Sequence, residues 1–375
     1  MTTVVIGATV AAKTGNAGNA WSRLAWISGF RALGFDVHLV EQLWGSRDAD
    51  FAAYAWASQW AEREGLRDRW TMRTAAGAMR TVGTAPPLDT ILDDAALILN
   101  IGGHLPIALL ERSPAVRVYL DDDPVFTQVW NARRPGDNRI DAHALHLTYG
   151  SNIGTRACAV PTAGIDWHGI QPPVDCARWT SLPLPEDFRF STVATWRCPY
   201  GPIELDGFTL ALKHQEWRKL ADLPKQVHAP MHAAIAFDHA DHRDKTRLES
   251  GGWFVHDPRH VAGTPAEYFD WIRASSAEVS PAQGVYASTE CGWLSDRTAC
   301  YLAAGRPALV QSTGALLPTG EGLVTFDDLD SAVDGALAIT ADAERHSKAA
   351  RAIAEEYFDA ALAARRVCEL AGVAP

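Results

Sequence analysis

The chain has 375 residues, a length that fits two domains of ordinary size. Its 47% hydrophobic and 21% charged residues are typical of a globular protein and exclude an intrinsically disordered one. The net charge of −11 argues against a general affinity for nucleic acid, and no apolar run approaches the roughly 18 residues needed to span a bilayer.

The N-terminus and the cysteines favour a cytoplasmic protein. Residues 1–9 run directly into a strand-like segment, without the charged and apolar regions of a secretion signal. The six cysteines form no CxxC pair and have no histidine partners at zinc-ligand spacing. We therefore expect free thiols and a cytoplasmic location.

The first half of the sequence alternates strands and helices. Residues 4–9 form an apolar, β-branched run, a helix with i, i+3, i+4 apolar spacing ends near residue 32, and residues 37–40 form a second buried strand. This βαβ opening predicts a parallel sheet. Residues 45–85, rich in Ala, Trp and Arg, are expected to be helical.

The segment after the first strand is rich in glycine and asparagine. Its residues Gly15, Asn16 and Gly18 lack the full G-x-G-x-x-G spacing of a dinucleotide site. Glu41 ends the second strand but is not a convincing ribose partner. The three loop residues therefore fit either a loop at a ligand cleft or a plain turn.

Two further buried strands, at 95–101 and 116–120, end in polar residues. His104 follows the first, and the acidic run 121–123, with Asp122 at its centre, follows the second. Open α/β sheets bind ligands at the carboxyl ends of parallel strands. Asp122 and His104 are therefore candidate catalytic acid or base residues, and solvated turn residues are the alternative interpretation.

A proline-rich stretch at 171–187 has no helical periodicity and is predicted to be a linker. It separates a predicted domain at 1–170 from a second one at 188–345, and a helix is expected over 346–375. Buried strands of the second domain are predicted at residues 188–196, 233–237, 253–255, 277–280 and 308–311.

Two helix starts are well marked in the second domain. Thr264 is an expected N-cap, with Pro265 at the first helical position and Glu267 at the third. The helix start Ser295-Asp296-Arg297-Thr298 begins a second helix, which is expected to end before Gly305 and a proline.

The segment 288–310 resembles the donor-site element of GT-B glycosyltransferases. In those enzymes a glycine-containing loop leads into a helix that ends in a small-small-Gly-x-Pro stop, here Ala303-Ala304-Gly305-Arg306-Pro307, before a buried strand. Thr313 and Gly314 resemble the loop that follows this strand. His256 lies in the segment 253–257, which resembles the nucleobase-side strand and loop.

The resemblance implies an α/β fold with two Rossmann-like, doubly wound domains that face each other across a cleft. The C-terminal helix would pack back toward the N-terminal domain. The implied activity is the metal-independent transfer of a sugar from a UDP- or TDP-sugar, as co-substrate and without a separate cofactor, to an acceptor in the cleft. Neither the acceptor nor the oligomeric state follows from the sequence.

The resemblance also indicates how the diphosphate is bound. The helix start at 295–298 offers unpaired N–H groups and the positive end of a dipole, and Arg297 adds a charged donor. Arg197, just past a predicted strand, and Lys213, at the next helix, resemble the Arg/Lys pair that binds phosphate in related enzymes. Placement of both on an ordinary surface is the alternative.

One departure from the family pattern keeps other functions open. Many retaining members carry a second glutamate on the donor-site helix, about where this chain has Cys300, while Glu290 lies in the preceding loop. A nucleotide-sugar epimerase of the same fold and a non-catalytic nucleotide-sugar-binding protein remain alternatives. The D-x-D run at 121–123 matches the metal–diphosphate signature of the other large glycosyltransferase fold, but the resemblance to GT-B enzymes, which usually work without metal, implies no metal there. The histidines between 228 and 242 show no closed metal-ligand set, so we expect no metal at them either.

Overall fold

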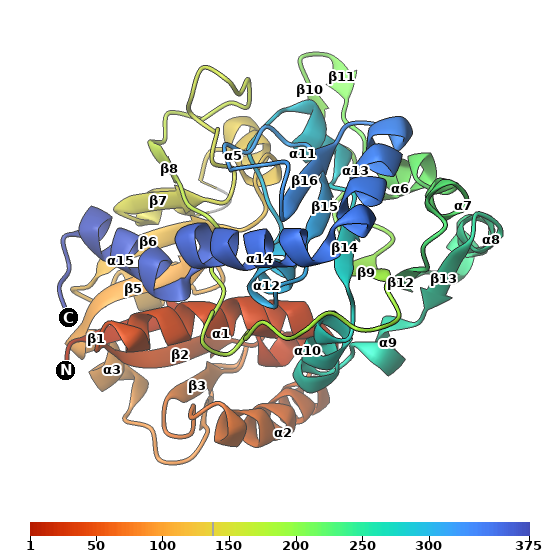
Figure 1. Ribbon diagram of the computed structural model, residues 1–375. Helices are drawn as coiled ribbons and strands as arrows, with labels where there is room; N and C mark the ends of the chain where they lie inside the picture. Colours follow the sequence, from red (N-terminus) through yellow and green to blue (C-terminus); the bar gives the residue numbers. More distant parts are fainter. Residues whose placement is uncertain (137–138) are drawn as a thin grey trace. The chain divides into compact units, whose positions relative to one another are not determined.

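The computed structural model describes residues 1–136 and 139–375 and contains two compact units, each built on a largely parallel sheet (Figure 1). Unit 1 comprises Met1–Tyr149, Pro161–Pro173 and Ala360–Pro375. Unit 2 comprises Gly150–Val160 and Val174–Asp359. Both units are therefore discontinuous in sequence, whereas the domains predicted at 1–170 and 188–345 are continuous segments.

In unit 1 the strand order is β4-β3-β2-β1-β5-β6-β7-β8. Neighbouring strands pair in parallel, except for the antiparallel pair β3–β4. The order reverses between β1 and β5, and ligands of open α/β sheets bind outside the carboxyl ends of the strands at such a point. The strands are β1 Thr3–Gly7, β2 Asp36–Gln42, β3 Trp70–Arg73, β4 Met79–Thr81, β5 Ala95–Ile101, β6 Val116–Asp121, β7 Leu145–Thr148 and β8 Trp167–Gly169.

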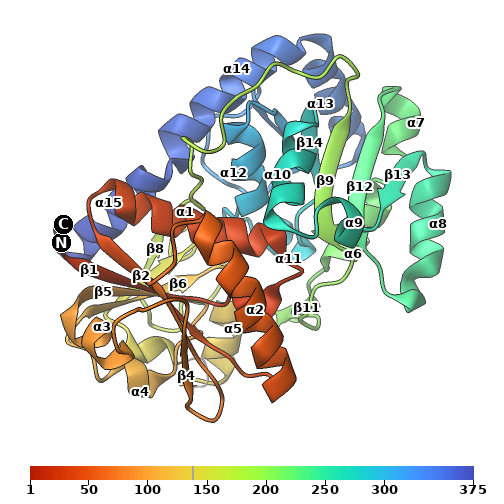
Figure 2. The same cartoon turned by 90° about the horizontal axis from the view of Figure 1, so that it is seen from below.

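The helices of unit 1 include the C-terminal one, α15, which packs against α1 (Figure 2). A Cβ atom on Gly29 of α1 would lie 2.2 Å from the carbonyl oxygen of Ala360, so a glycine is needed at this contact. The helical segments are η1 Ala11–Lys13, α1 Ala17–Ala32, α2 Arg47–Arg63, α3 Leu88–Asp94, α4 Ile107–Leu110, α5 Phe126–Arg133, η2 Ile140–Ala142 and α15 Ala360–Ala371.

In unit 2 the order of the main sheet is β13-β12-β9-β14-β15-β16, with all neighbours parallel. The order reverses between β9 and β14, which makes this the corresponding position for a ligand. The strands are β9 Phe190–Thr195, β12 Met231–Ala236, β13 Trp253–His256, β14 Ala277–Ser280, β15 Ala308–Gln311 and β16 Leu323–Phe326, and a separate hairpin joins β10 Glu204–Leu205 to β11 Phe208–Thr209.

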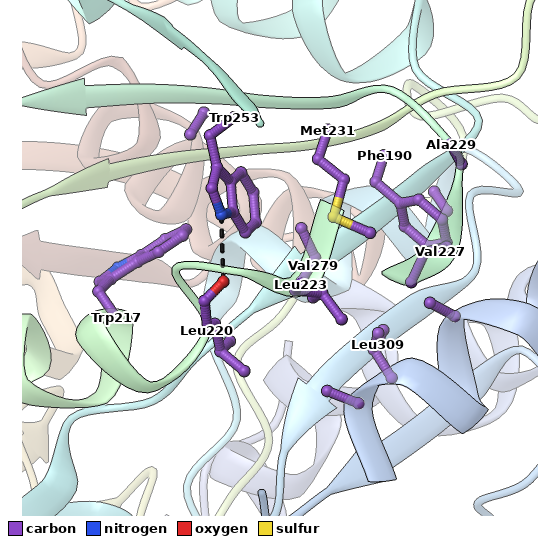
Figure 3. Close-up of a cluster of buried hydrophobic side chains, with 14 of the residues drawn as sticks. Phe190, Trp217, Leu220, Leu223, Val227, Ala229, Met231, Trp253, Val279 and Leu309 are labelled. Atoms are coloured by element: carbon purple, nitrogen blue, oxygen red, sulfur yellow. Dashed lines mark hydrogen bonds between the residues drawn. The ribbon is translucent and has the colours of Figure 1, made fainter. Parts of the chain in front are cut away.

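The core of unit 2 lies where helices cover this sheet (Figure 3). Trp217 and Trp253 pack edge to face with ring centroids 5.3 Å apart, and the Trp253 indole N–H donates to the Leu220 carbonyl at 3.1 Å. The helical segments are α6 Lys213–Lys219, α7 Leu223–Val227, η3 His239–Asp241, α8 His242–Ser250, α9 Pro258–Val261, α10 Pro265–Arg273, α11 Gly284–Ser288, α12 Asp296–Ala303, α13 Leu329–Ala341, α14 Ala343–Ile353 and η4, a π-helix, Ala354–Phe358.

Two sequence predictions differ from the structure. Residues 45–85 are not all helical, because β3 and β4 occupy part of them, and Trp70 and Met72 of β3 are fully buried beside β2. The helix expected over 346–375 is interrupted near Asp359, where the Val174 N–H donates to the Phe358 carbonyl at 2.7 Å. This carbonyl pairs outside the helix, so the helix is not continuous.

The local signals were read correctly. The strands predicted at 95–101, 277–280 and 308–311 are confirmed with these bounds. The Thr264 cap of α10 and the Ser295 cap of α12 are confirmed too. Among the described residues no helix is both long and apolar enough to cross a membrane.

Candidate functional site

The two residues predicted to be catalytic come together in unit 1. His104 follows β5 and Asp122 follows β6, which are neighbouring parallel strands. A Cβ atom built on Gly102 would lie 3.1 Å from Asp122 Oδ1 and 3.2 Å from His104 Nε2. Both polar atoms therefore border the small space that this glycine leaves open, and its φ of +64° also favours glycine.

Charged groups from the first helix and its loop complete this cluster. Arg23 of α1 donates from Nη2 to Asp122 Oδ2 at 2.5 Å, which leaves Oδ1 toward Gly102. Desolvation lowers the pKa of His104 to about 4, although the charge of Asp122 acts in the opposite direction, so His104 is neutral at pH 7. Lys13 is exposed as a residue, yet desolvation of its amine, and next the charge of Arg23, lower its pKa.

Asp121, the residue before Asp122, has a structural role. It is 1% exposed, and Oδ2 accepts from Gln128 Nε2 and from the Thr148 hydroxyl, both at 2.7 Å. Burial raises its pKa to about 6. Further along the loop, buried Val125 has a φ of 71°, a strained backbone for a β-branched residue. Asp121 and Val125, one on each side of Asp122 in the sequence, are therefore both buried and fix the turn that contains it.

The segment between β1 and the first turn of α1 has two parts, residues 10–12 and the predicted cleft loop at 15–18. Asn16 is the N-cap of α1, where its side chain accepts from the Asn19 N–H at 3.1 Å, and Gly18 lies in the first turn of this helix. Gly15 is exposed, with open space where a Cβ atom would stand. For Asn16 the plain-turn interpretation is sufficient, and a ligand contact of the three residues remains a prediction.

The other part of this segment is occupied by a carboxylate of the protein itself. The backbone N–H groups of Val10, Ala11 and Ala12 donate to the Glu41 carboxylate at 2.8, 2.9 and 3.0 Å. Glu41 is fully buried, and this burial raises its pKa, whereas the three N–H groups act to lower it. Glu41 thus fixes the loop that carries Lys13 and occupies three donors that an anionic ligand would need.

In unit 2 the start of α12 is capped from within. Ser295 accepts from the Arg297 N–H at 3.3 Å, and Asp296 Oδ1 accepts from the same group at 2.8 Å. Thr298, in the first turn, is fully buried. The predicted anion site at this helix start therefore already has one of its N–H groups satisfied by the protein's own side chains.

The Arg297 side chain lies inside unit 2. It donates from Nε to Glu278 Oε1 at 2.6 Å, from Nη1 to the Val193 carbonyl at 2.7 Å and from Nη2 to the Ser280 hydroxyl. Strands β9 and β14 pair at Ser191–Glu278 and then separate. The guanidinium fills the gap between their carboxyl ends, so its proposed contact with a diphosphate competes with three internal acceptors.

Three further predicted donor residues occupy different parts of unit 2. Arg197 forms a two-point pair with the buried Asp241 carboxylate, with Nε 2.9 and 3.0 Å from the two oxygens. Lys213 is the first residue of α6, and its N–H donates to Gln283 Oε1 at 3.3 Å. His256 stacks on His232 with ring centroids 5.2 Å apart.

A pocket of about 540 Å³ lies at the carboxyl ends of β15 and β16. Thr313 belongs to its wall, and no side chain in the wall is ionisable. Within the described residues, none of the four backbone N–H groups of 313–316 donates to a protein acceptor. The lining residues are Leu294, Val310, Gln311, Ser312, Thr313, Ala315, Leu316, Leu317, Pro318, Thr319, Leu323 and Thr325.

Sequence reasoning missed several residues at these two sites. Arg23 was not considered, and Glu41 was placed at a strand end without its role; both are buried charges whose partners follow other strands. Asn152 bonds to both donor-site loops of unit 2. It follows β7, a strand that the sequence analysis did not predict, and recognition of that strand would have placed Asn152 among the polar residues at strand ends.

Comparison with solved structures identifies the fold. An α-glucosyltransferase in complex with UDP has 10% sequence identity and a TM-score of 0.59, covering 99% of each chain. HepE from Anabaena in complex with UDP-glucose has 15% identity and a TM-score of 0.59, again over 99% of both chains. The N-terminal domain of trehalose-6-phosphate phosphatase from Candida albicans has 8% identity and a TM-score of 0.57, covering 99% of this chain and 97% of that one.

No protein-family model matches the sequence, and no curated protein matches it. At the low identities of the structural matches, the likeness establishes the fold and leaves the chemistry to the site itself. With two doubly wound parallel sheets, the chain has the GT-B fold of the nucleotide-sugar-dependent glycosyltransferases.

Proposed function

We propose that this protein is a glycosyltransferase that moves a sugar from a UDP- or TDP-linked donor to an acceptor. The observation that carries the proposal is the run of four N–H groups without protein acceptors at 313–316, beside the pocket of about 540 Å³. Gly314, with φ +76°, lies within this run, and a left-handed residue lets successive N–H groups point to one side. Such donors bind a diphosphate and stabilise the charge of a leaving nucleotide.

Two of the structural relatives support this choice of donor. One was solved with UDP and another with UDP-glucose. The donor contact of Lys213 remains a proposal, and so does that of His256, which ends β13 at the opposite edge of the sheet from β16. The Arg297 side chain is 13% exposed and all three of its nitrogens donate to internal acceptors, so we assign it the role of shaping the site. Arg197, whose side chain is 49% exposed beside Asp241, stays a proposed contact of the diphosphate.

The acid–base step is assigned to unit 1. In the transfer, the bond from the sugar C1 to the donor phosphate oxygen breaks and a bond from C1 to the acceptor oxygen forms. The acceptor hydroxyl loses its proton to Asp122 Oδ1, the oxygen that Arg23 leaves unbonded, with neutral His104 beside it as the second acceptor. The departing diphosphate takes the negative charge, which the backbone N–H groups stabilise, so this mechanism needs no metal ion.

Calorimetric titration of the purified chain tests the donor site. We expect UDP to bind and uridine to bind far more weakly, because the N–H groups contact the diphosphate. Ala315→Pro removes one of these N–H groups and should lower UDP affinity about ten- to a hundredfold, while Ala315→Ser keeps the group and should bind as the wild type does. Equal affinity for UDP in all three proteins would contradict the assignment.

Product analysis then separates transfer from the two alternatives. Incubation with UDP- and TDP-sugars and a panel of acceptors should release free nucleoside diphosphate together with a glycosylated product. An altered sugar still attached to the nucleotide would identify an epimerase. Tight binding with neither product would identify a binding protein. A thermal-shift screen of nucleotide sugars comes first, since a bound donor raises the apparent stability by mass action.

A further inference from the structure

Three residues with left-handed backbone geometry meet in unit 2 around one buried side chain, that of Asn152. They are Glu290, Gly292 and Gly314, with φ values of 46°, 79° and 76°. Asn152 is 4% exposed, and its Nδ2 donates to the Glu290 carbonyl at 2.8 Å and to the Gly314 carbonyl at 2.9 Å. One amide group therefore joins the loop before α12 to the loop after β15.

The neighbouring contacts reinforce this junction. The Asn152 N–H donates to the Cys291 carbonyl at 3.0 Å, and the Ser151 hydroxyl donates to the Gly292 carbonyl at 3.0 Å. The Gly292 N–H donates to the Thr313 carbonyl at 2.7 Å. The two loops are thus bonded to each other and to the segment 151–152.

The chemistry of the junction requires an amide side chain. Both loops present carbonyl oxygens, and an asparagine NH₂ group supplies two donors from one nitrogen. An aspartate offers no donor when ionised, and a serine offers one. The arrangement also stabilises Glu290, whose left-handed backbone is unfavourable for a residue with a side chain.

We propose that Asn152 is a positioning residue for the donor site, which fixes the loop 313–316 in the conformation that turns its N–H groups toward the pocket. This inference rests on the proposed function, which assigns the diphosphate of the donor as the ligand of this loop. Asn152 acts through the loop: it bonds to the Gly314 carbonyl, while the N–H groups of the same loop have no protein acceptor among the described residues.

The test is N152D, which keeps the size and shape of the side chain. Its carboxylate would face the Glu290 and Gly314 carbonyls without an N–H group. We expect UDP affinity at pH 8 to fall about ten- to a hundredfold relative to the wild type. The ratio of variant to wild-type affinity should recover as the pH falls, because the protonated acid regains one O–H donor and two facing carbonyls favour the neutral form.

Two further variants control the experiment. S151A removes a bond from the same segment to Gly292 and should leave UDP affinity within about threefold of the wild type. N152S retains one donor, so its affinity for UDP should lie between those of the wild type and N152D. If N152D folds poorly, N152S replaces it in the test. Hydrogen exchange without ligand should be faster in N152D than in the wild type at the N–H groups of Gly292 and Ser312, which donate to the Thr313 and Phe326 carbonyls.

The outcomes distinguish the two proposals. If the wild type binds UDP and N152D binds it equally at pH 8, the positioning role of Asn152 is wrong and the proposed function stands. If the wild type binds no nucleotide sugar or nucleoside diphosphate, the proposed function is wrong. In that case unchanged exchange at the Gly292 and Ser312 N–H groups in N152D would overturn the positioning of the loop as well, whereas faster exchange would support it.

Discussion

Arg23 Nη2 lies 2.5 Å from Asp122 Oδ2, and this ion pair joins α1 to the turn after β6. The Arg23 side chain is 6% exposed and that of Asp122 is 19% exposed, so solvent screens the pair little. A buried ion pair of this kind adds little stability compared with a pair of apolar side chains in its place. The loss of one partner alone, however, leaves a buried charge without a counter-charge. The pair therefore makes the position of Asp122 sensitive to Arg23.

We expect Arg23→Met to destabilise the protein by about 3 kcal/mol at pH 7, measured by urea unfolding, because the Asp122 carboxylate stays behind partly buried. The double variant R23M/D122N should recover much of this loss, since it removes both charges. Arg67→Ala is the matched control. Its pair with Glu62 is exposed on both sides and its loss should not measurably change the stability. An equal effect of R23M and R67A would contradict the argument.

The pH dependence of stability should carry the signature of His143. It is 6% exposed, its Nε2 lies 3.1 Å from Asn100 Nδ2 and its Nδ1 lies 3.1 Å from the Ile140 carbonyl. This arrangement suits the neutral ring that accepts from the amide and donates to the carbonyl. Burial lowers the pKa of His143 to about 4 from an ordinary value of 6.5.

Between pH 6.5 and pH 4 His143 is protonated in the unfolded chain but stays neutral in the folded protein. The free energy of unfolding therefore decreases as the pH falls through this range. His143→Gln removes this contribution. The stability of H143Q relative to the wild type should therefore rise by up to about 3 kcal/mol from pH 7 to pH 4. A difference between the two proteins that stays constant from pH 7 to pH 4 would contradict this role of His143.

Arg297 and Glu278 give a second, opposite pH signature. Glu278 is fully buried, and burial raises its pKa, whereas Arg297 lowers it. Arg297→Met removes the cation, and we expect a loss of about 3–5 kcal/mol at pH 8. Without Arg297 the pKa of Glu278 should rise further. The variant should then be more stable at pH 5 than at pH 8 relative to the wild type, because a raised acid pKa gives stability that is lost as pH rises.

Urea unfolding of R297M at the two pH values, beside the double variant R297M/E278Q, checks this expectation. The double variant lacks the buried charge and should show little of the added pH dependence. Arg259→Ala, which breaks an exposed pair with Asp257, should leave the stability unchanged. A loss in R297M that is the same at pH 5 and pH 8 would mean that removal of Arg297 does not change the pKa of Glu278 in this range.

The structural features that were predicted correctly are those that depend on residues close together in the sequence. Strands 95–101 and 308–311 are continuous apolar runs because helices cover both faces of a parallel sheet, and the Thr264 cap is a local arrangement. The meeting of His104 with Asp122 also follows from such signals, since both residues come directly after neighbouring strands.

The direction of the Arg297 side chain was not predictable in this way. Its position at a helix start indicates a phosphate ligand, yet the guanidinium points to Val193 and Glu278, because β9 and β14 separate there and leave a gap. Asn152 was missed for a related reason. Its partners lie 138 and 162 residues away in the chain, and no local pattern marks a contact over that distance.

Alanine substitutions at Gly292 and Gly207 separate the cost of backbone strain at positive φ from the cost of a steric clash. Gly292 and Gly207 have nearly the same φ, 79° and 81°, so an alanine suffers similar backbone strain at both positions. A Cβ atom at 292 would lie 2.3 Å from Ser151 Oγ and 2.9 Å from the Asn152 N atom, whereas at 207 it meets nothing within 4 Å. Gly207→Ala should therefore cost about 1 kcal/mol of stability in urea unfolding, from strain alone.

Gly292→Ala should cost at least about 2 kcal/mol more, because the backbone of the segment 151–152 must move to admit the methyl group. The displacement breaks the bonds that Asn152 makes to Glu290 and Gly314, so UDP affinity should fall in G292A and stay unchanged in G207A. Combining G292A with S151G, which frees the space of the nearest side-chain atom, should restore part of the stability. Equal losses in G292A and G207A would show that the strain at positive φ, and not the contact with residues 151–152, sets the requirement for glycine.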